Sequence, residues 1–311
     1  MDKFPQKNGY FKIYSTVILI LLFSKVIYSQ CCSANPVVGT TNVGLLSKNT
    51  LREIAYYRYS YSDTYYEGSI KQPDIHYLKY SWYSYVGNII SFGISNKFTT
   101  DLELGYYIKK QELTDASRIF YSQGWNNGIL SVKYGLIKNS NFECTIGSGL
   151  KFPFTKNVLK DNYNRPLSVS LQTSTNAFGG VFLLFLQKNF PEYQFRIVLN
   201  HRTEAFNGYN SNYYMKGNTF STSLFLSKSL DTHWNIILQL RNDYRSRDYW
   251  YDKAIIGTGG YVWIFSPQIN FNLKGFYFSL LYDKPFYYYT NEKQIVNKYA
   301  ISFICTKDFN L

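Results

Sequence analysis

Apolar and polar side chains alternate with a period of two residues along much of this chain. The clearest run is 233–242 (HWNIILQLRN), where every second residue from Trp234 to Leu240 is apolar and most residues between them are polar. The same period recurs in 100–110, 142–152 and 193–201. Because successive side chains of a β-strand point to opposite faces, this pattern predicts strands with one apolar and one polar face.

The same period predicts twelve strands separated by connections of two kinds. The predicted strands are 51–61, 83–94, 100–110, 128–137, 142–152, 178–187, 193–201, 219–227, 233–242, 260–270, 275–282 and 298–307. Five connections have four or five residues, namely 95–99, 138–141, 188–192, 228–232 and 271–274. Six have fifteen residues or more, namely 62–82, 111–127, 153–177, 202–218, 243–259 and 283–297. Short and long connections alternate strictly.

This alternation predicts an all-β fold, a closed antiparallel transmembrane β-barrel with short periplasmic turns and long extracellular loops. Closure is expected because an open sheet edge in lipid would leave backbone groups unpaired. A soluble β-sandwich could also contain twelve strands, but it would not require the regular asymmetry of the connections. Residues 165–177 are expected to be an ordered loop; if they added strands, the total would become fourteen.

The N-terminus has the features of a secretory signal peptide. Lys3, Lys7 and Lys12 precede an eleven-residue apolar run, 13–23, which is shorter than the roughly 20 residues that a membrane-spanning helix needs. Cleavage after Ser29 divides the chain into a signal peptide (1–29), a periplasmic segment (30–50) and the barrel (51–311). The expected location is the outer membrane of a Gram-negative cell.

Composition agrees with a membrane barrel. The chain has 32 Tyr and 24 Phe, and barrels use aromatic side chains in girdles at both headgroup levels. The formal net charge is +13, but the basic residues are scattered and an exported chain would not meet nucleic acid. The expected partners are outer-membrane lipid and lipopolysaccharide, a small-molecule solute and the outer-membrane assembly machinery. The assembly machinery is expected because the aromatic-rich last strand, 298–307, looks like an assembly signal. The oligomeric state is left open.

Several segments follow one another in a familiar order. They are LREIAYYRYSYSD (51–63), GSGLKFPFT (147–155), TGGYVWIFSPQINF (258–271) and DKPFYYYTNEKQI (283–295). Together they resemble the outer-membrane "transporter" proteins related to the family named for the MetA pathway of phenol degradation. The resemblance implies a barrel with a role in small-molecule passage, and it does not imply phenol as the substrate.

Strand parity predicts a polar barrel interior. The expected pore-lining residues are Arg58, Glu103, Lys133, Glu143, Arg196, Gln239 and Arg241, and the same parity points Lys109 and Lys151 inward. A charge facing lipid at the bilayer midplane costs about 2–4 kcal/mol, which is why these side chains are assigned to the lumen. Arg196 and Arg241 are expected to help form a constriction. If the charges pair across the interior they plug the barrel; if they line water, the excess of basic residues would favour anions.

Other candidate chemistry is sparse. The Cys31–Cys32 pair could bind a soft metal ion, or it could be oxidised or cross-linked to a partner, and no further ligands accompany it. Cys144 and Cys305 are expected to face lipid. His201 has no neighbouring serine and acidic group that would complete a hydrolytic site, so we expect no catalytic residues, no cofactor and no enzymatic activity.

The expected function is passive passage of a small solute, and a preference for anions or for aromatic compounds is compatible with it. The alternative is a plugged barrel that acts as a binding, adhesion or partner-docking platform. The loops 62–82 and 243–259 are rich in Tyr and Arg, which suits either partner binding or contacts with lipopolysaccharide.

Overall fold

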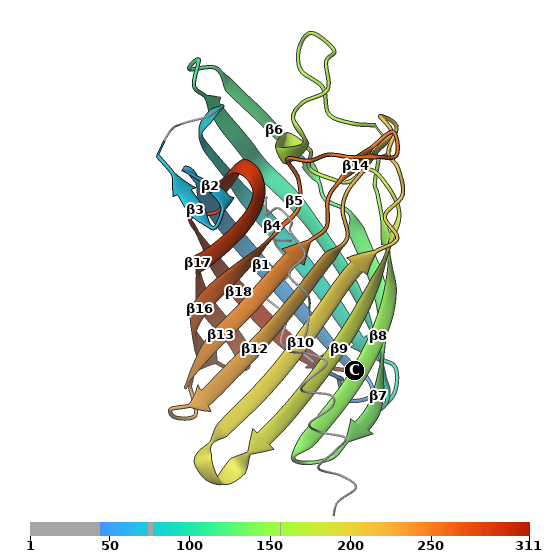
Figure 1. The fold of residues 1–311 in the computed structure, drawn as a ribbon. Helices are drawn as coiled ribbons and strands as arrows, with labels where there is room; N and C mark the ends of the chain where they lie inside the picture. Colours follow the sequence, from blue (N-terminus) through green and yellow to red (C-terminus); the bar gives the residue numbers. More distant parts are fainter. Residues whose placement is uncertain (1–43, 74–76, 156) are drawn as a thin grey trace, which may run out of the picture.

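Twelve long antiparallel strands close into a tilted barrel (Figure 1). The computed structural model describes residues 44–73, 77–155 and 157–311. The barrel strands are β1 (Thr50–Ser62), β4 (Leu78–Gly93), β5 (Phe98–Thr114), β7 (Gly128–Lys138), β8 (Phe142–Phe152), β9 (Gly179–Phe190), β10 (Phe195–Ala205), β12 (Thr219–Ser229), β13 (Trp234–Arg245), β16 (Gly260–Leu273), β17 (Phe276–Val296) and β18 (Tyr299–Asn310). Each pairs with its neighbours in sequence, and β1 pairs with β18 from Thr50↔Asn310 onward, which closes the barrel. The predicted fold class is confirmed.

The long connections gather at one end of the barrel and the short turns at the other (Figure 1). The long connections carry β2 (Thr64–Gly68), β3 (Ile70–Gln72), β6 (Ile119–Trp125), β11 (Tyr214–Met215), β14 (Tyr249–Trp250) and β15 (Lys253–Ala254), and one 3₁₀ turn, η1 (Val169–Leu171); the short turn before β10 carries another, η2 (Pro191–Tyr193). Residues 165–177 therefore add no barrel strand. No helix in the described part of the chain is long and apolar enough to cross a membrane.

Strand β17 differs most from its predicted extent. We predicted a strand over 275–282 followed by a long loop, but β17 continues to Val296 and pairs with β2 beyond the barrel rim. Pro285 lies inside this strand although proline cannot donate to a sheet ladder. The ladder with β16 accommodates it through a register shift between Trp263 and Ile264, next to the Ile264↔Pro285 pair.

The two faces of the barrel follow the predicted parity in most strands, with a clear exception in β5. On the outer face, Leu240 and the alternate residues before it in β13 are exposed, as a lipid-facing surface requires. In β5, however, Lys110 is buried, whereas Lys109 has its amine over the rings of Trp82 and Tyr121. The ladder between β4 and β5 has a register shift here, and a bulge shifts the alternation by one residue. The inward assignment of Lys109 was wrong for this reason.

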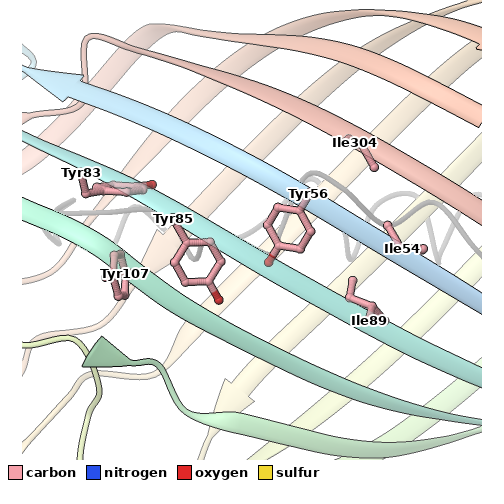
Figure 2. Packing of buried hydrophobic residues seen from close by; sticks show 7 residues of the cluster. All are labelled: Ile54, Tyr56, Tyr83, Tyr85, Ile89, Tyr107 and Ile304. Carbon is pink, nitrogen blue, oxygen red and sulfur yellow. The ribbon is translucent and has the colours of Figure 1, made fainter. Parts of the chain in front are cut away.

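Tyrosines cover one wall of the interior (Figure 2). The rings of Tyr85 and Tyr107 meet edge to face with centroids 4.8 Å apart, and Tyr56 lies 5.8 Å from Tyr85. A Cβ added to Gly105 would lie 1.6 Å from the hydroxyl of Tyr85, and one at Gly87 would lie 2.2 Å from the ring of Tyr56. These two glycines therefore leave room for the rings to lie against the barrel wall.

Candidate functional site: a charged interior below an outer cavity

An aspartate shared by two arginines occupies the barrel interior. Asp283 is fully buried; its Oδ2 accepts from Nη2 of Arg58 at 2.5 Å and from Nη2 of Arg241 at 3.2 Å. Its Oδ1 accepts from the hydroxyl of Ser266 at 2.5 Å, and Nε of Arg241 lies 3.1 Å from Oδ2 of Asp243. The cluster joins side chains from four strands, β1, β13, β16 and β17. It therefore connects the first barrel strand with strands from the last third of the chain.

A second cluster joins β5, β8 and β10. Nη1 of Arg202 donates to both carboxylate oxygens of Glu103, at 2.9 and 3.0 Å, while its Nε and Nη2 donate to Glu204. Glu204 is also 3.2 Å from Nζ of Lys151, which donates to the side chain of Asn207 at 2.6 Å. All four charged side chains of this cluster are buried. Fork-like contacts of this kind fix a guanidinium in one orientation.

The third cluster holds the start of the described chain inside the barrel. Lys133 forms an ion pair with Asp101 at 2.8 Å and donates to the carbonyl of Gly44 at 3.3 Å. Glu143 accepts from the backbone N–H of Leu45 at 2.7 Å. Leu46 donates through its own N–H to Thr99 Oγ1 at 3.0 Å. Residues 44–46 therefore occupy part of the lumen near the short-turn end.

A small cavity of about 50 Å³ lies between the second and third clusters. Its lining includes Glu103, Arg202, Lys133, Ser221 and Phe225. That volume accommodates a few water molecules at most. The space between these two clusters is therefore small.

A much larger cavity of about 550 Å³ lies at the long-loop end. Its floor includes barrel-wall residues such as Tyr107, Lys110 and Arg245, and its sides come from the loops that follow β8, β10 and β13. Burial alone would raise the pKa of Asp248 in the last of these loops, but ion pairing and hydrogen bonding with Arg245 bring that pKa below its usual range. Tyr214 and the N–H of Gly217 also donate to Asp248, which fixes the loops against one another.

Six of the seven residues predicted to line a pore have buried side chains in the interior, and the seventh is partly buried. The buried residues are Arg58, Glu103, Lys133, Glu143, Gln239 and Arg241. Arg196 is the partly buried one. Whether any of them lines a conducting passage stays a prediction.

Arg196 and Arg241 do not share one level of the barrel. Arg196 pairs with Ser227, whereas Arg241 pairs with Ser223, four residues earlier in β12. At about 3.3 Å per residue this separates the two arginines by roughly 13 Å along the strands. The register therefore does not bring these two arginines together, and Arg241 instead contacts Asp283 and Asp243.

The remaining candidates show no reactive arrangement. His201 points outward, where its ring nitrogens lie 2.8 Å from Thr222 Oγ1 and 2.9 Å from Thr203 Oγ1, without an acidic partner among the described residues. Cys144 and Cys305 lie on the outer face as single partly exposed thiols. Cys31 and Cys32 lie outside the described residues. Within the residues that the structure covers, no cluster of three metal-binding side chains occurs.

Sequence reasoning missed Asp283, Arg202 and Glu204, which all fell in predicted loops. Strands β10 and β17 continue past the predicted ends, and the period-two pattern continues with them: Arg202 and Glu204 follow Asn200 at intervals of two. This continued alternation was the signal that could have placed them inside.

Comparisons with known proteins agree with this architecture. No protein-family model matches the chain, and no curated protein matches its sequence. Among solved structures, the chain is similar to an outer-membrane channel from Pseudomonas putida F1, with a TM-score of 0.71 and 11% identity over 89% of this chain and 100% of that chain. A KdgM porin (TM-score 0.45, 10% identity, 83% and 99% coverage) and a FadL homologue from Pseudomonas aeruginosa (0.44, 8%, 91% and 100%) are less similar. The first similarity shows that this chain has the fold of an outer-membrane channel.

Proposed function

We propose that this chain is an outer-membrane channel that gives passive passage to a small solute. The observation that carries the proposal is the cavity of about 550 Å³ at the long-loop end, whose floor is formed by polar and charged residues of the barrel lumen. A barrel with an apolar outer surface and a polar interior is the arrangement of outer-membrane channels. The sequence motifs further support a distant relation to the "transporter" proteins of the phenol-degradation family, and the N-terminal signal supports export to the outer membrane.

The three charged clusters together form the proposed constriction. The three clusters contain five basic side chains, Arg58, Lys133, Lys151, Arg202 and Arg241, and six acidic ones, Asp101, Glu103, Glu143, Glu204, Asp243 and Asp283. Their charges almost balance, so the net positive charge of the whole chain does not make the constriction selective for anions. These paired charges instead suit a solute with a polar or charged group that replaces one partner of an ion pair at a time.

Planar-bilayer recordings test this function. The purified, folded protein is expected to give discrete conductance steps, while a heat-denatured sample of the same preparation gives none. Liposome swelling with a series of small sugars, organic anions and aromatic compounds then ranks the solutes. Folded protein that gives neither current above the lipid baseline nor swelling would refute passage.

The pairing of charges across the interior favours one alternative, a non-transporting barrel. In that function the clusters and residues 44–46 seal the lumen, and the Tyr- and Arg-rich loops bind a partner such as lipopolysaccharide. Absence of conductance together with saturable binding of lipopolysaccharide to the folded barrel would support it.

A further inference from the structure

The outer cavity has an unusual combination of lining residues. Its apolar side chains are Val158, Pro166, Leu167, Val169, Ile255 and Trp250. Amide and hydroxyl groups of Asn, Gln, Ser and Thr residues complete the wall. A volume of about 550 Å³ falls within the range of roughly 300–1,000 Å³ that is typical of small-molecule sites. The apolar fraction suits a solute with a hydrocarbon body rather than a simple inorganic ion.

The charged groups of the cavity are three basic residues and one acidic residue. Arg245 and Asp248 form an ion pair with each other. The amine of Lys110 donates to the carbonyl of Gln172 at 2.8 Å and lies 4.6 Å from the centre of the Tyr107 ring. These contacts fix both basic groups within the protein.

Lys216 is different from the other basic residues. Among the residues that the structure describes, no carboxylate forms an ion pair with its amine. The nearby charges are Arg245, Lys151, Glu204 and Asp248. Withdrawal from solvent, followed by the repulsion from Arg245 and Lys151, lowers the pKa of Lys216 to about 8. Such an ammonium group is stabilised by an anion that enters the cavity.

We propose that the outer cavity binds a small organic monoanion with an apolar body, whose acidic group lies against the ammonium of Lys216. This inference names the solute class of the channel and in that respect rests on the proposed function. The hydrocarbon body packs against the apolar wall near Trp250 and Ile255. Asp248 is already paired with Arg245, so it repels a bound anion less than an unpaired carboxylate would. A neutral sugar would leave Lys216 without a counter-charge.

Calorimetric titration of the full-length protein in lipid nanodiscs tests the site without requiring conduction. The probes are cyclohexanecarboxylate and its neutral counterpart cyclohexylmethanol, which differ mainly in charge. The carboxylate is expected to bind at least tenfold more tightly than the alcohol. Lys216→Met, which keeps the length of the side chain but removes its charge, is expected to abolish that difference. Equal affinity for the two probes, or an unchanged difference in Lys216→Met, would overturn the proposal.

Two further variants serve as controls for this titration. Lys216→Arg retains a positive charge and is expected to preserve the preference for the carboxylate. Lys253→Met removes an exposed loop charge outside the lining and is expected to bind as the parent protein does. Heat-modifiable migration in gels confirms that every variant is folded before it is titrated.

The pH dependence gives a second readout. Because the lysine pKa is lowered to about 8, its charge is present below that pH and is lost as the pH rises through it. Carboxylate affinity is therefore expected to fall roughly tenfold between pH 6 and pH 9, where about a tenth of the amines stay charged. The Lys216→Arg variant is expected to show no such fall. A parallel fall in both proteins would contradict the role of Lys216.

The outcomes separate the two proposals. Charge-dependent binding without bilayer conductance would refute passage and leave the binding site standing. Conductance without charge-dependent binding would refute the anion site and leave passage standing.

Discussion

The Asp283 cluster makes a quantitative prediction about the barrel interior. Asparagine in place of Asp283 keeps the shape of the side chain but removes the charge that Arg58 and Arg241 share, at 2.5 and 3.2 Å. All three side chains are at most 1% exposed, so solvent cannot replace the lost partner. Removal of one member of a buried ion pair costs about 3–5 kcal/mol because the remaining charge is left without compensation.

A second ion pair provides a matched control. Arg52 and Asp308 are also 2.5 Å apart, but their side chains are 23% and 34% exposed. An exposed pair contributes only about 0.2–1 kcal/mol, so Asp308→Asn is expected to change the free energy of unfolding by no more than that. The two substitutions are identical in chemistry and differ in burial.

Urea titration of the micelle-folded protein, followed by tryptophan fluorescence, measures both free energies of unfolding. We expect Asp283→Asn to lower the midpoint strongly and Asp308→Asn to leave it almost unchanged. If the two variants lose the same stability, the buried cluster does not stabilise the barrel in the way described. The double variant Asp283→Asn with Arg241→Gln is expected to be less destabilised than the sum of the single changes, because it removes one of the two uncompensated charges.

Three further predictions follow from other parts of the barrel. A side chain at Gly135 would place a Cβ 2.2 Å from Leu45, so Gly135→Val should displace residues 44–46 and raise single-channel conductance; unchanged conductance would show that these residues do not narrow the passage. Leu240 lies on the outer face, and Leu240→Arg should lower the free energy of unfolding by about 2–4 kcal/mol if it sits near the bilayer midplane, whereas Leu240→Phe should be nearly neutral. The folded protein should not hydrolyse phospholipid, and His201→Ala should leave a phospholipase assay at its background; hydrolysis abolished by that change would identify an enzyme.

The strands and their two faces could be predicted because a strand leaves a local pattern. In 233–242 each apolar residue alternates with a mostly polar neighbour, and the structure places the first set outside and the second inside. The strict alternation of short and long connections then sufficed to predict a closed barrel of twelve strands. Lys109 shows the limit of this reasoning, because a single bulge reverses the faces and leaves no clear trace in the sequence.

The partners within the interior could not be predicted in the same way. Glu103 and Arg202 are separated by 99 positions, and they meet because the barrel closes, not because of any spacing in the chain. The lumenal position of residues 44–46 likewise depends on hydrogen bonds to Glu143 and Thr99 in other strands. Parity indicates which charges point inward, but only the three-dimensional register determines which of them pair.

Paired charges and passage are compatible for an energetic reason. A buried ion pair is rarely more stable than well-packed apolar residues of the same volume, because removing two charges from water offsets most of their attraction. A barrel that served only as a sealed scaffold could therefore fill its interior with apolar side chains at no cost in stability. The clusters around Asp283 and Arg202 instead present charged groups that a polar solute can contact, directly below a cavity large enough to hold one. Paired charges are therefore compatible with the proposed passage, and the Gly135→Val recording would decide whether residues 44–46 restrict it.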